Sequence, residues 1–522
     1  MAATHSIALD GLVGRPIEVE VDVSSGMPGT ILVGLADTVV NEARDRVRSA
    51  VVNSGTTWPD QRVTINLAPS SVPKSGSHFD LAIAVGVFAA KGMVPAEPLA
   101  GSALLGELAL DGRLRPVRGV LPATLAAVDA GFRRIFVPDS NVAEARLVPG
   151  IDVCGLRSLG HLVAMLTGTP EPDDPPVPPL EECADDGEPF PVELDLTDVA
   201  GQEDARVALL VAASGGHHLA MTGPPGVGKT MLAQRLPGLL PDLSTEAALE
   251  TSAVHSLAGT LPSGRPLLTR PPFIDPHHSA SAVAIIGGGT RHIRPGAMSL
   301  AHRGVLFLDE APEFASNVLD ALRQPLESGH IVVSRIHQTA VFPARFQLVL
   351  ASNPCPCGQS GSLSDQCQCS PTMRRRYHDR ISGPIRDRVD IHRTLTSPTR
   401  PELARSTGQS RPSSELAAIV LAARERQARR LAGTAWRFNC EVPGTVFRKE
   451  FPLSDAARRL LESEVRGQKL SARAADRVAG LAWSVADIHG HQRPDADDVG
   501  IAVALRQNRH LGSPLRRLVA AS

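Results

Sequence analysis

The run Gly223-Pro-Pro-Gly-Val-Gly-Lys-Thr230 decides the fold of this chain, because it matches the phosphate-binding P-loop G-x-x-x-x-G-K-[ST]. Residues 218–222 before it predict a short buried strand, and residues 231–236 after it predict the start of a helix. Glycines let a backbone wrap closely around a polyphosphate, and a helix N-terminus offers it free N–H groups. Lys229 is expected at the β- and γ-phosphates and Thr230 on Mg²⁺. The expected ATP-binding residues are Gly223, Pro224, Pro225, Gly226, Val227, Gly228, Lys229 and Thr230.

Two further apolar runs end in polar residues that suit nucleotide chemistry. Gly304-Val-Leu-Phe-Leu-Asp-Glu310 is typical of a Walker B strand, in which Asp309 holds Mg²⁺ and Glu310 orients and deprotonates the attacking water. Gln347-Leu-Val-Leu-Ala-Ser-Asn353 ends in Asn353, which suits a sensor of the γ-phosphate. Ordinary alternatives exist for both runs, namely an acidic helix N-cap after the first and an Asn-Pro turn after the second.

Two arginines are candidates for the positive charges that phosphoryl transfer requires. Arg388 follows a Ser-Gly-Pro turn and is expected to reach a neighbouring subunit's nucleotide as a finger, a role worth roughly 10³–10⁵ in rate. A surface ion pair explains Arg388 equally well. Arg473 lies early in a predicted helix of the last domain, from which it is expected to touch the γ-phosphate as a lid sensor.

Composition describes an ordinary globular protein of several domains. The chain has 522 residues, 43% of them hydrophobic and 21% charged, with a net charge of −2, so any nucleic-acid surface must be a local patch. Aromatic residues make up only 3%, which argues against a surface built on base stacking. The N-terminus does not resemble a secretory signal, and no apolar stretch is long enough to span a membrane. We therefore expect a cytoplasmic enzyme without a membrane partner.

The pattern along the chain predicts an α/β multidomain protein. Residues 1–168 predict a mixed α/β unit, including a hairpin at Asp111-Gly112, and residues 169–194 predict a Pro-rich acidic linker. Residues 195–395 predict the P-loop α/β core, and residues 396–414 a polar connector. Residues 415–522 predict a helical domain.

Four of the seven cysteines form two C-x-C pairs on one short segment. In a reducing compartment such clustering favours a metal over disulfides, and four thiolates suit tetrahedral Zn²⁺. Redox-active or incidental cysteines are the alternative. The expected zinc ligands are Cys355, Cys357, Cys367 and Cys369.

Two basic segments are candidates for contact with DNA. Arg291 and Arg294 lie on a glycine-rich insertion between the two Walker motifs, and Arg335 lies on one arm of a predicted hairpin. Arginines on such loops would contact phosphates without reading the base sequence. Solvated loop charges are an equally good explanation.

A long ordered set of motifs makes the chain similar to the ComM/YifB branch of the Mg-chelatase-like AAA+ family, over nearly its whole length. The segments that carry the resemblance are Val33-Gly-Leu-Ala-Asp37, Ile65-Asn-Leu-Ala-Pro69, Gly106-Glu-Leu-Ala-Leu110, Gly201-Gln202, Pro276-His-His-Ser279, Gly287-Gly-Gly289, Ser299-Leu-Ala-His-Arg-Gly-Val-Leu-Phe-Leu-Asp-Glu310, Leu322-Arg-Gln-Pro-Leu-Glu327, Asn353-Pro-Cys-Pro-Cys-Gly358, Ser382-Gly-Pro384 and Asp387-Arg-Val-Asp390.

The resemblance implies a homo-hexameric AAA+ ring in which ATP hydrolysis drives branch migration of DNA during transformation, recombination or repair. It also implies that Arg388 acts in trans as the finger and that Arg473 is the lid sensor. The implied partners are further copies of the chain, branched or single-stranded DNA, and recombination proteins. The lid departs from the family pattern at Ala482-Trp-Ser-Val-Ala-Asp487, where relatives usually carry Ala-Arg-Thr-Ile-Ala-Asp.

The first domain resembles the Lon protease fold (ribosomal S5 domain 2-like, α+β) without its catalytic groups. The run Pro73-Lys-Ser-Gly-Ser-His78 places a histidine at the position of the Lon nucleophile, and Leu121 stands where its lysine base should be. We expect a binding or assembly module rather than a hydrolase.

Two other functions remain as alternatives to the DNA motor. A magnesium-chelatase-type ATPase subunit that remodels a metal-inserting partner is compatible with the AAA+ core. A Lon-like ATP-dependent protease is disfavoured by His78 and Leu121.

Overall fold

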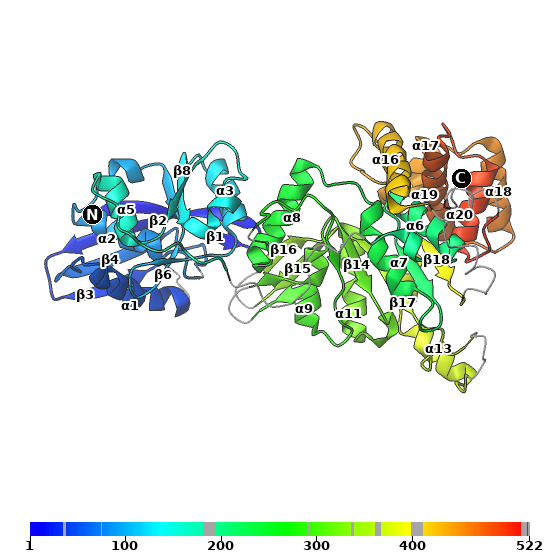
Figure 1. The fold of residues 1–522 in the computed structure, drawn as a ribbon, viewed down its shortest axis with the longest axis horizontal. Coiled ribbons are helices and arrows are strands. Elements are labelled where there is room, and N and C mark those ends of the chain that lie inside the picture. The colour runs from blue at the N-terminus through cyan, green and yellow to red at the C-terminus, as the bar shows by residue number, and fades with distance from the viewer. Residues whose placement is uncertain are drawn as a thin grey trace.

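The computed structural model describes residues 1–34, 38–74, 76–180, 194–262, 264–289, 293–335, 339–360, 367–397, 411–512 and 519. Three units follow one another along the longest axis of the molecule (Figure 1). The N-terminal unit lies at one end, the P-loop core in the middle, and the helical lid at the other end.

The described N-terminal unit contains a four-stranded sheet, a three-stranded sheet and a two-stranded hairpin. Its strands are β1 (Ala2–Asp10), β2 (Val13–Ser24), β3 (Gly29–Val33), β4 (Arg62–Ala68), β5 (Ser102–Leu104), β6 (Glu107–Leu108), β7 (Leu114–Arg115), β8 (Arg134–Pro138) and β9 (Asp152–Leu156). Its helices are α1 (Thr38–Asn53), α2 (Asp80–Ala90), α3 (Val120–Asp129), α4 (Val142–Ala145) and α5 (Leu159–Thr167). The larger sheet has the order β1-β2-β4-β3 and is mixed, and the smaller has the parallel order β5-β8-β9.

Alternation of side chains explains how the larger sheet faces its core. Ile17, Val19 and Val21 on β2 are fully buried, while Glu18 is exposed. The hairpin expected at Asp111-Gly112 is confirmed, since β6 and β7 pair antiparallel across it. Residues 169–180, which belong to the expected linker, contain no helix or strand. Val177 is nevertheless buried in the hydrophobic core of the N-terminal unit.

The central unit is a parallel five-stranded sheet with helices on both sides, so the predicted α/β P-loop core is confirmed. Its strands β10 (Leu219–Thr222), β11 (Phe273–Ile274), β14 (Val305–Leu308), β17 (Gln347–Ser352) and β18 (Ile391–Thr394) have the order β11-β14-β17-β10-β18. Its helices are α6 (Glu203–Gly215), α7 (Lys229–Arg235), α8 (Thr245–Ala258), α9 (Ala282–Ile286), α10 (Ala297–Leu300), α11 (Ser316–Ala321), α12 (Arg323–Ser328), α13 (Pro371–Asp379) and α14 (Gly383–Arg388).

Two hairpins interrupt the core, and both lie toward the N-terminal unit. They are β12 (Gly287–Gly288) with β13 (Arg294–Pro295), and β15 (His330–Ser334) with β16 (Thr339–Pro343). A side-chain carbon added at Gly11, in the β1–β2 turn, would stand 3.3 Å from the carbonyl oxygen of Val341 on β16. The N-terminal unit therefore packs directly on the second hairpin.

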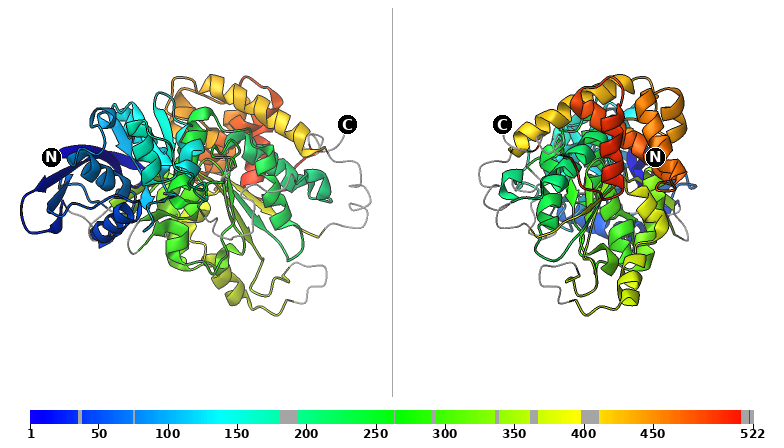
Figure 2. Two further views of the ribbon diagram at one scale, coloured as in Figure 1. Left: turned by 60° about the vertical axis from the view of Figure 1, so that its left-hand side comes forward. Right: turned by 90° about the vertical axis from the view of Figure 1, so that its right-hand side faces the viewer.

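The lid consists of α16 (Ser413–Arg430), α17 (Gly444–Lys449), α18 (Asp455–Arg466), α19 (Ala472–His489) and α20 (Ala496–Arg506). It shares one hydrophobic core with the central sheet, to which Leu209 and Val211 of α6 and Val478 and Leu481 of α19 all belong. Figure 2 shows the lid packed along one side of the central unit. In the described part of the chain, no helix is both long and apolar enough to cross a membrane.

Candidate functional site: a nucleotide edge and an arginine edge

The P-loop follows β10 at the carboxyl edge of the parallel sheet, where ligands of such sheets bind. Gly226 and Gly228 have φ angles of 78° and 95°, a left-handed conformation that favours glycine. A side-chain carbon at Gly223 would stand 2.7 Å from the carbonyl oxygen of Leu395, so this position also requires a residue without one. The loop is therefore shaped for close approach of its backbone to a phosphate.

Lys229 is buried at the centre of this loop. Its ammonium donates to the carbonyl oxygens of Gly223 (2.7 Å) and Pro224 (3.0 Å) and to Oδ1 of Asn353 (3.1 Å). Burial lowers the pKa of Lys229, and the charges of Asp309 and Glu310 partly offset this effect. The P-loop lysine and the expected sensor Asn353 are thus in direct contact.

The Walker B residues lie across from the P-loop, at the end of β14. The Thr230 hydroxyl donates to Oδ2 of Asp309 at 2.7 Å, so the two expected Mg²⁺ ligands are adjacent. Asp309 Oδ1 also accepts from the backbone N–H of Glu310 at 2.8 Å. Hydroxyl and carboxylate oxygens in this arrangement suit Mg²⁺, which would neutralise phosphate charge there.

Glu310 has a left-handed backbone with a φ of 49°, which is uncommon outside glycine. Its carboxylate lies 3.1 Å from Nδ1 of His278. Nothing in the sequence pattern predicts that His278 contacts the Walker B glutamate. The Pro276-His-His-Ser279 motif was the available signal.

Asp275 is a second residue that the sequence did not reveal. It follows β11, at the same edge of the sheet as Asp309. Asp275 keeps contact with solvent, and partial desolvation together with the nearby Asp309 carboxylate raises its pKa to about 6. The two-residue strand before it is too short to produce a recognisable pattern in the sequence.

Arg388 and Arg473 lie at the opposite, amino edge of the sheet, where they line a cavity of about 930 Å³ together with Arg477, Asp390 and Glu327. The walls of this cavity include residues that directly precede β10, β14 and β18. Arg388 donates to the carbonyl oxygen of Pro384 at 2.7 Å and forms an ion pair with Glu327. Burial and the neighbouring guanidinium groups lower the pKa of Arg388.

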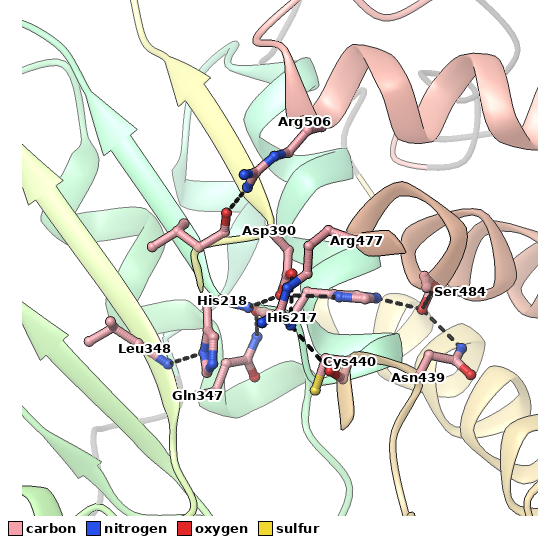
Figure 3. A network of polar contacts seen from close by, with 12 residues as sticks. His217, His218, Gln347, Leu348, Asp390, Asn439, Cys440, Arg477, Ser484 and Arg506 are labelled. Carbon is pink, nitrogen blue, oxygen red and sulfur yellow. Dashed lines mark hydrogen bonds and ion pairs between the residues drawn. The ribbon is translucent and has the colours of Figure 1, made fainter. Parts of the chain in front are cut away.

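A buried polar network beneath this cavity joins the sheet to the lid (Figure 3). Asp390 accepts from the backbone N–H of His218 at 3.1 Å and lies 3.4 Å from Nδ1 of His217 and 3.5 Å from Arg477. Burial alone would raise the pKa of Asp390, but Arg477 and His217 hold it below its ordinary value. Nε2 of His217 lies 2.7 Å from the hydroxyl oxygen of Ser484 on α19. The network therefore holds the lid at this edge of the sheet.

The two edges separate the expected catalytic residues into two groups. Lys229, Thr230, Asp309, Glu310 and Asn353 come together at the carboxyl edge. Arg388 and Arg473 come together at the amino edge, because α19 is held there by the Asp390 network. Neither arginine lies at the P-loop of its own chain, which is at the other edge of the sheet.

The four clustered cysteines also come together. Their sulfur atoms lie within 4.8 Å of one another, with Cys355–Cys357 at 3.3 Å and Cys355–Cys367 and Cys357–Cys367 at 3.6 Å. Cys355 and Cys369 are buried, whereas Cys357 is exposed. Zn–S bonds of about 2.3 Å in a tetrahedron place the sulfurs about 3.8 Å apart, so the cluster fits one zinc ion.

Of the three candidate DNA arginines, Arg294 and Arg335 are exposed and Arg291 lies outside the described residues. Arg294 pairs with Gly288 across β12 and β13. A side-chain carbon at Gly288 would stand 2.8 Å from a guanidinium nitrogen of Arg335. The two inserted hairpins are therefore adjacent, and they gather these arginines on one side of the core.

In the N-terminal unit, the two positions that resemble the Lon catalytic pair have other roles. Leu121 is fully buried at the contact between α3 and α8. The His78 ring lies 3.0 Å from the carbonyl oxygen of Ile7. Glu144 accepts from the backbone N–H of Leu121 at 2.8 Å and from the hydroxyl of Ser256 on α8, which ties this unit to the core.

Comparison with known families agrees with this architecture. Residues 195–403 match the family described as magnesium chelatase, subunit ChlI, residues 19–141 match subunit ChlI of Mg-chelatase, and residues 410–506 match the magnesium chelatase subunit ChlI C-terminal family.

Three relatives match over nearly their full length. An uncharacterised protein of Mycobacterium tuberculosis (strain H37Rv) is 48% identical over 97% of this chain and 99% of its own. The uncharacterised protein YifB of Salmonella typhimurium is 40% identical over 100% of both chains. Competence protein ComM of Haemophilus influenzae is 40% identical over 94% of this chain and 95% of its own.

A P-loop paired with a Walker B carboxylate on a parallel sheet, followed by a helical lid, defines an AAA+ ATPase. Identity of this extent to YifB and ComM specifies the class further. The chain belongs to the Mg-chelatase-like family of ComM and YifB proteins.

Proposed function

We propose that this chain is the subunit of a ring that couples ATP hydrolysis to movement of branched or single-stranded DNA. One observation carries the ring: the phosphate grip and the two arginines occupy opposite edges of one sheet, so a complete site needs two copies. Heterologous contacts of this kind, when repeated, form a ring if the rotation between copies closes on itself. We propose a homo-hexamer, as the family resemblance implies.

In the proposed reaction, Mg²⁺ bound at Thr230 and Asp309 supplies positive charge to the β- and γ-phosphates. Glu310 takes a proton from the attacking water while the bond between the γ-phosphorus and the bridging oxygen breaks, giving ADP and phosphate. Asn353 and Lys229 hold the γ-phosphate, and Arg388 and Arg473 of the adjacent copy stabilise the charge that develops on it. The P-loop edge and the arginine edge would then form a complete catalytic site only at an interface between two subunits.

The DNA part of the proposal is supported by the paired hairpins that carry Arg294 and Arg335, and by the name of the Haemophilus relative, a competence protein. The hairpins lie side by side and are basic, as expected for loops that follow a phosphate backbone. The second candidate is a magnesium-chelatase-type ATPase subunit, which the family descriptions favour. It predicts ATP hydrolysis that responds to a protein partner rather than to DNA.

The deciding experiment measures separation of a labelled four-way DNA junction by the assembled protein with ATP and Mg²⁺. We expect ATP-dependent separation that is abolished in Lys229→Ala and in Glu310→Gln. The double change Arg294→Ala with Arg335→Ala should weaken DNA binding and reduce its salt slope by about 1 per lost phosphate contact. Arg459→Ala, which removes an exposed arginine of the lid, is the matched control. Assembled protein that neither binds DNA nor changes its ATPase rate with DNA would refute the motor.

A further inference from the structure

The cysteine loop lies against the nucleotide site at several points, and this position suggests a task beyond holding its own shape. Among described residues 354–360 and 367–370, only Cys355, Gly358 and Cys369 are buried, so the loop has no apolar core of its own. Binding of structural zinc supplies folding free energy to such segments. A bound metal is therefore the one strong source of order that the chemistry of this loop offers.

The first contact joins the loop to the P-loop. Gly358 has a φ of 75°, and a side-chain carbon there would stand 2.8 and 2.9 Å from two ring carbons of Pro225. The backbone of the cysteine loop thus lies directly on the phosphate-binding loop, with no space for a larger residue. A displacement of this loop would release one wall of the P-loop.

The second contact runs through the chain itself. Asn353, which accepts from Lys229, precedes the first cysteine by only one residue, Pro354. The carbonyl oxygen of Pro354 lies 3.0 Å from Nε2 of His378 at the end of α13. The sensor side chain is therefore held between a strand on one side and the cysteine cluster on the other.

The third contact reaches the segment after the Walker B strand. Helix α13 begins just after Cys369, and Arg380 at its end donates to the carbonyl oxygen of Pro312 (2.9 Å) and to Glu313 (3.0 Å). Arg374 of the same helix donates to the carbonyl oxygen of Cys369 at 3.2 Å and lies 3.4 Å from the sulfur of Cys367. Its charge would offset part of the negative charge of the four thiolates when they hold a metal ion. In Figure 1, α13 projects below the end of β17.

We propose that a zinc ion held by Cys355, Cys357, Cys367 and Cys369 is a fixed strut of the nucleotide site, whose occupancy sets ATP affinity and turnover. The ion keeps the loop on Pro225 and holds Asn353 toward Lys229. When it is lost, the loop leaves the P-loop and the sensor loses its position. This inference rests on the proposed ATPase function for its effect on turnover. Zinc binding by the four cysteines does not depend on that function and can be measured separately.

The first test compares metal content with nucleotide binding in Cys357→Ser, which alters the exposed ligand, and in Cys154→Ser, a control thiol of β9. Elemental analysis should find about one zinc per subunit in wild type and in the control, and almost none in Cys357→Ser. Affinity for a fluorescent ATP analogue and turnover should each fall roughly 10- to 100-fold in Cys357→Ser, since displaced groups cost this much. Circular dichroism and gel filtration show whether the variant remains folded.

The second test separates the metal from its effect on the site. Gly358→Ala retains all four thiols and so should retain zinc, while its methyl group pushes the loop off Pro225 and lowers ATP affinity. The proposal is wrong if purified wild-type protein contains no zinc. It is also wrong if Cys357→Ser lacks zinc but binds and hydrolyses ATP normally. Zinc-loaded wild type that binds no ATP would instead refute the proposed ATPase, and the two failures are therefore distinguishable.

Discussion

Individual side chains at the carboxyl edge are held by contacts that the motifs alone do not specify. Glu310 is the residue expected to activate water, and its side chain is about half exposed, so a neighbouring group is needed to fix its direction. His278 supplies that neighbour at 3.1 Å. The adjacent His277 instead contacts the Ser279 hydroxyl at 2.7 Å, so two histidines in sequence have different tasks.

We predict that His278→Ala lowers the turnover number roughly tenfold and leaves ATP affinity unchanged, a part of the 10²–10⁴ that a general base contributes. The reason is that Glu310 loses its orienting partner while Lys229 and Thr230 keep their contacts. Steady-state ATPase assays and nucleotide titration measure the two quantities. His277→Ala is the control and should behave as wild type. Equal turnover in both variants would show that Glu310 needs no partner.

At the scale of elements, β10, β17 and β18 are joined at their amino ends by the His218 and Asp390 contacts. His218 Nδ1 accepts the backbone N–H of Leu348 at 3.0 Å, so a proton on that nitrogen would remove the hydrogen bond. Burial accordingly lowers the pKa of His218 to about 4. The neutral ring is part of how the first residues of β10 and β17 are aligned.

This gives a pH dependence of defined sign. Between about pH 6.5 and pH 4 the unfolded chain binds a proton at His218 and the folded chain does not, so this residue makes stability fall as pH falls. In His218→Gln, the slope of unfolding free energy against pH should become shallower in that window by up to about 1.4 kcal/mol per pH unit. Urea unfolding at several pH values measures the slope. His277→Gln, at an exposed site, should leave it unchanged, and parallel curves for wild type and His218→Gln would contradict the prediction.

The sequence predicted those parts of the site that follow from short spacing along the chain or from the common edge of parallel strands. Lys229 and Thr230 lie together because they are neighbours in a loop, and Asp309 and Asn353 meet them because parallel strands end at one edge. Sequence could not indicate where the lid docks, because the contacts of Asp390 with His217, Arg477 and the α19 region join residues far apart in the chain. For that reason, the position of Arg473 beside Arg388 became visible only in the structure.

At the scale of the whole molecule, each subunit presents two different edges, one with the P-loop and one with the arginines. The N-terminal unit is fastened to the core by the buried contacts of Glu144 with Leu121 and Ser256, and the lid by the Asp390 network. Both flanking units therefore help to fix the directions in which the two edges face. Subunit mixing can test whether the edges complete one another.

We predict that Arg388→Ala and Lys229→Ala proteins are each inactive but regain ATPase activity when mixed. In a random equal mixture, about a quarter of the joints combine an intact P-loop from one variant with an intact finger from the other. ATPase rates of co-refolded or exchanged mixtures, followed against the mixing ratio, measure this recovery. A finger that served its own subunit would leave every mixture silent. Lys229→Ala mixed with Glu310→Gln is the matched control and should stay silent, because both changes disable the same edge.

In the proposed ring, a single copy has its P-loop at one edge and its arginines at the other, so on its own it would lack a complete site for hydrolysis. Newly made or dissociated protein would spend no nucleotide, however much is present in the cell. Assembly of the copies, whether through a higher protein concentration or through binding to one DNA strand, would therefore also start ATP hydrolysis. In the proposed ring, geometry alone would prevent hydrolysis of ATP by unassembled copies, without a separate inhibitor.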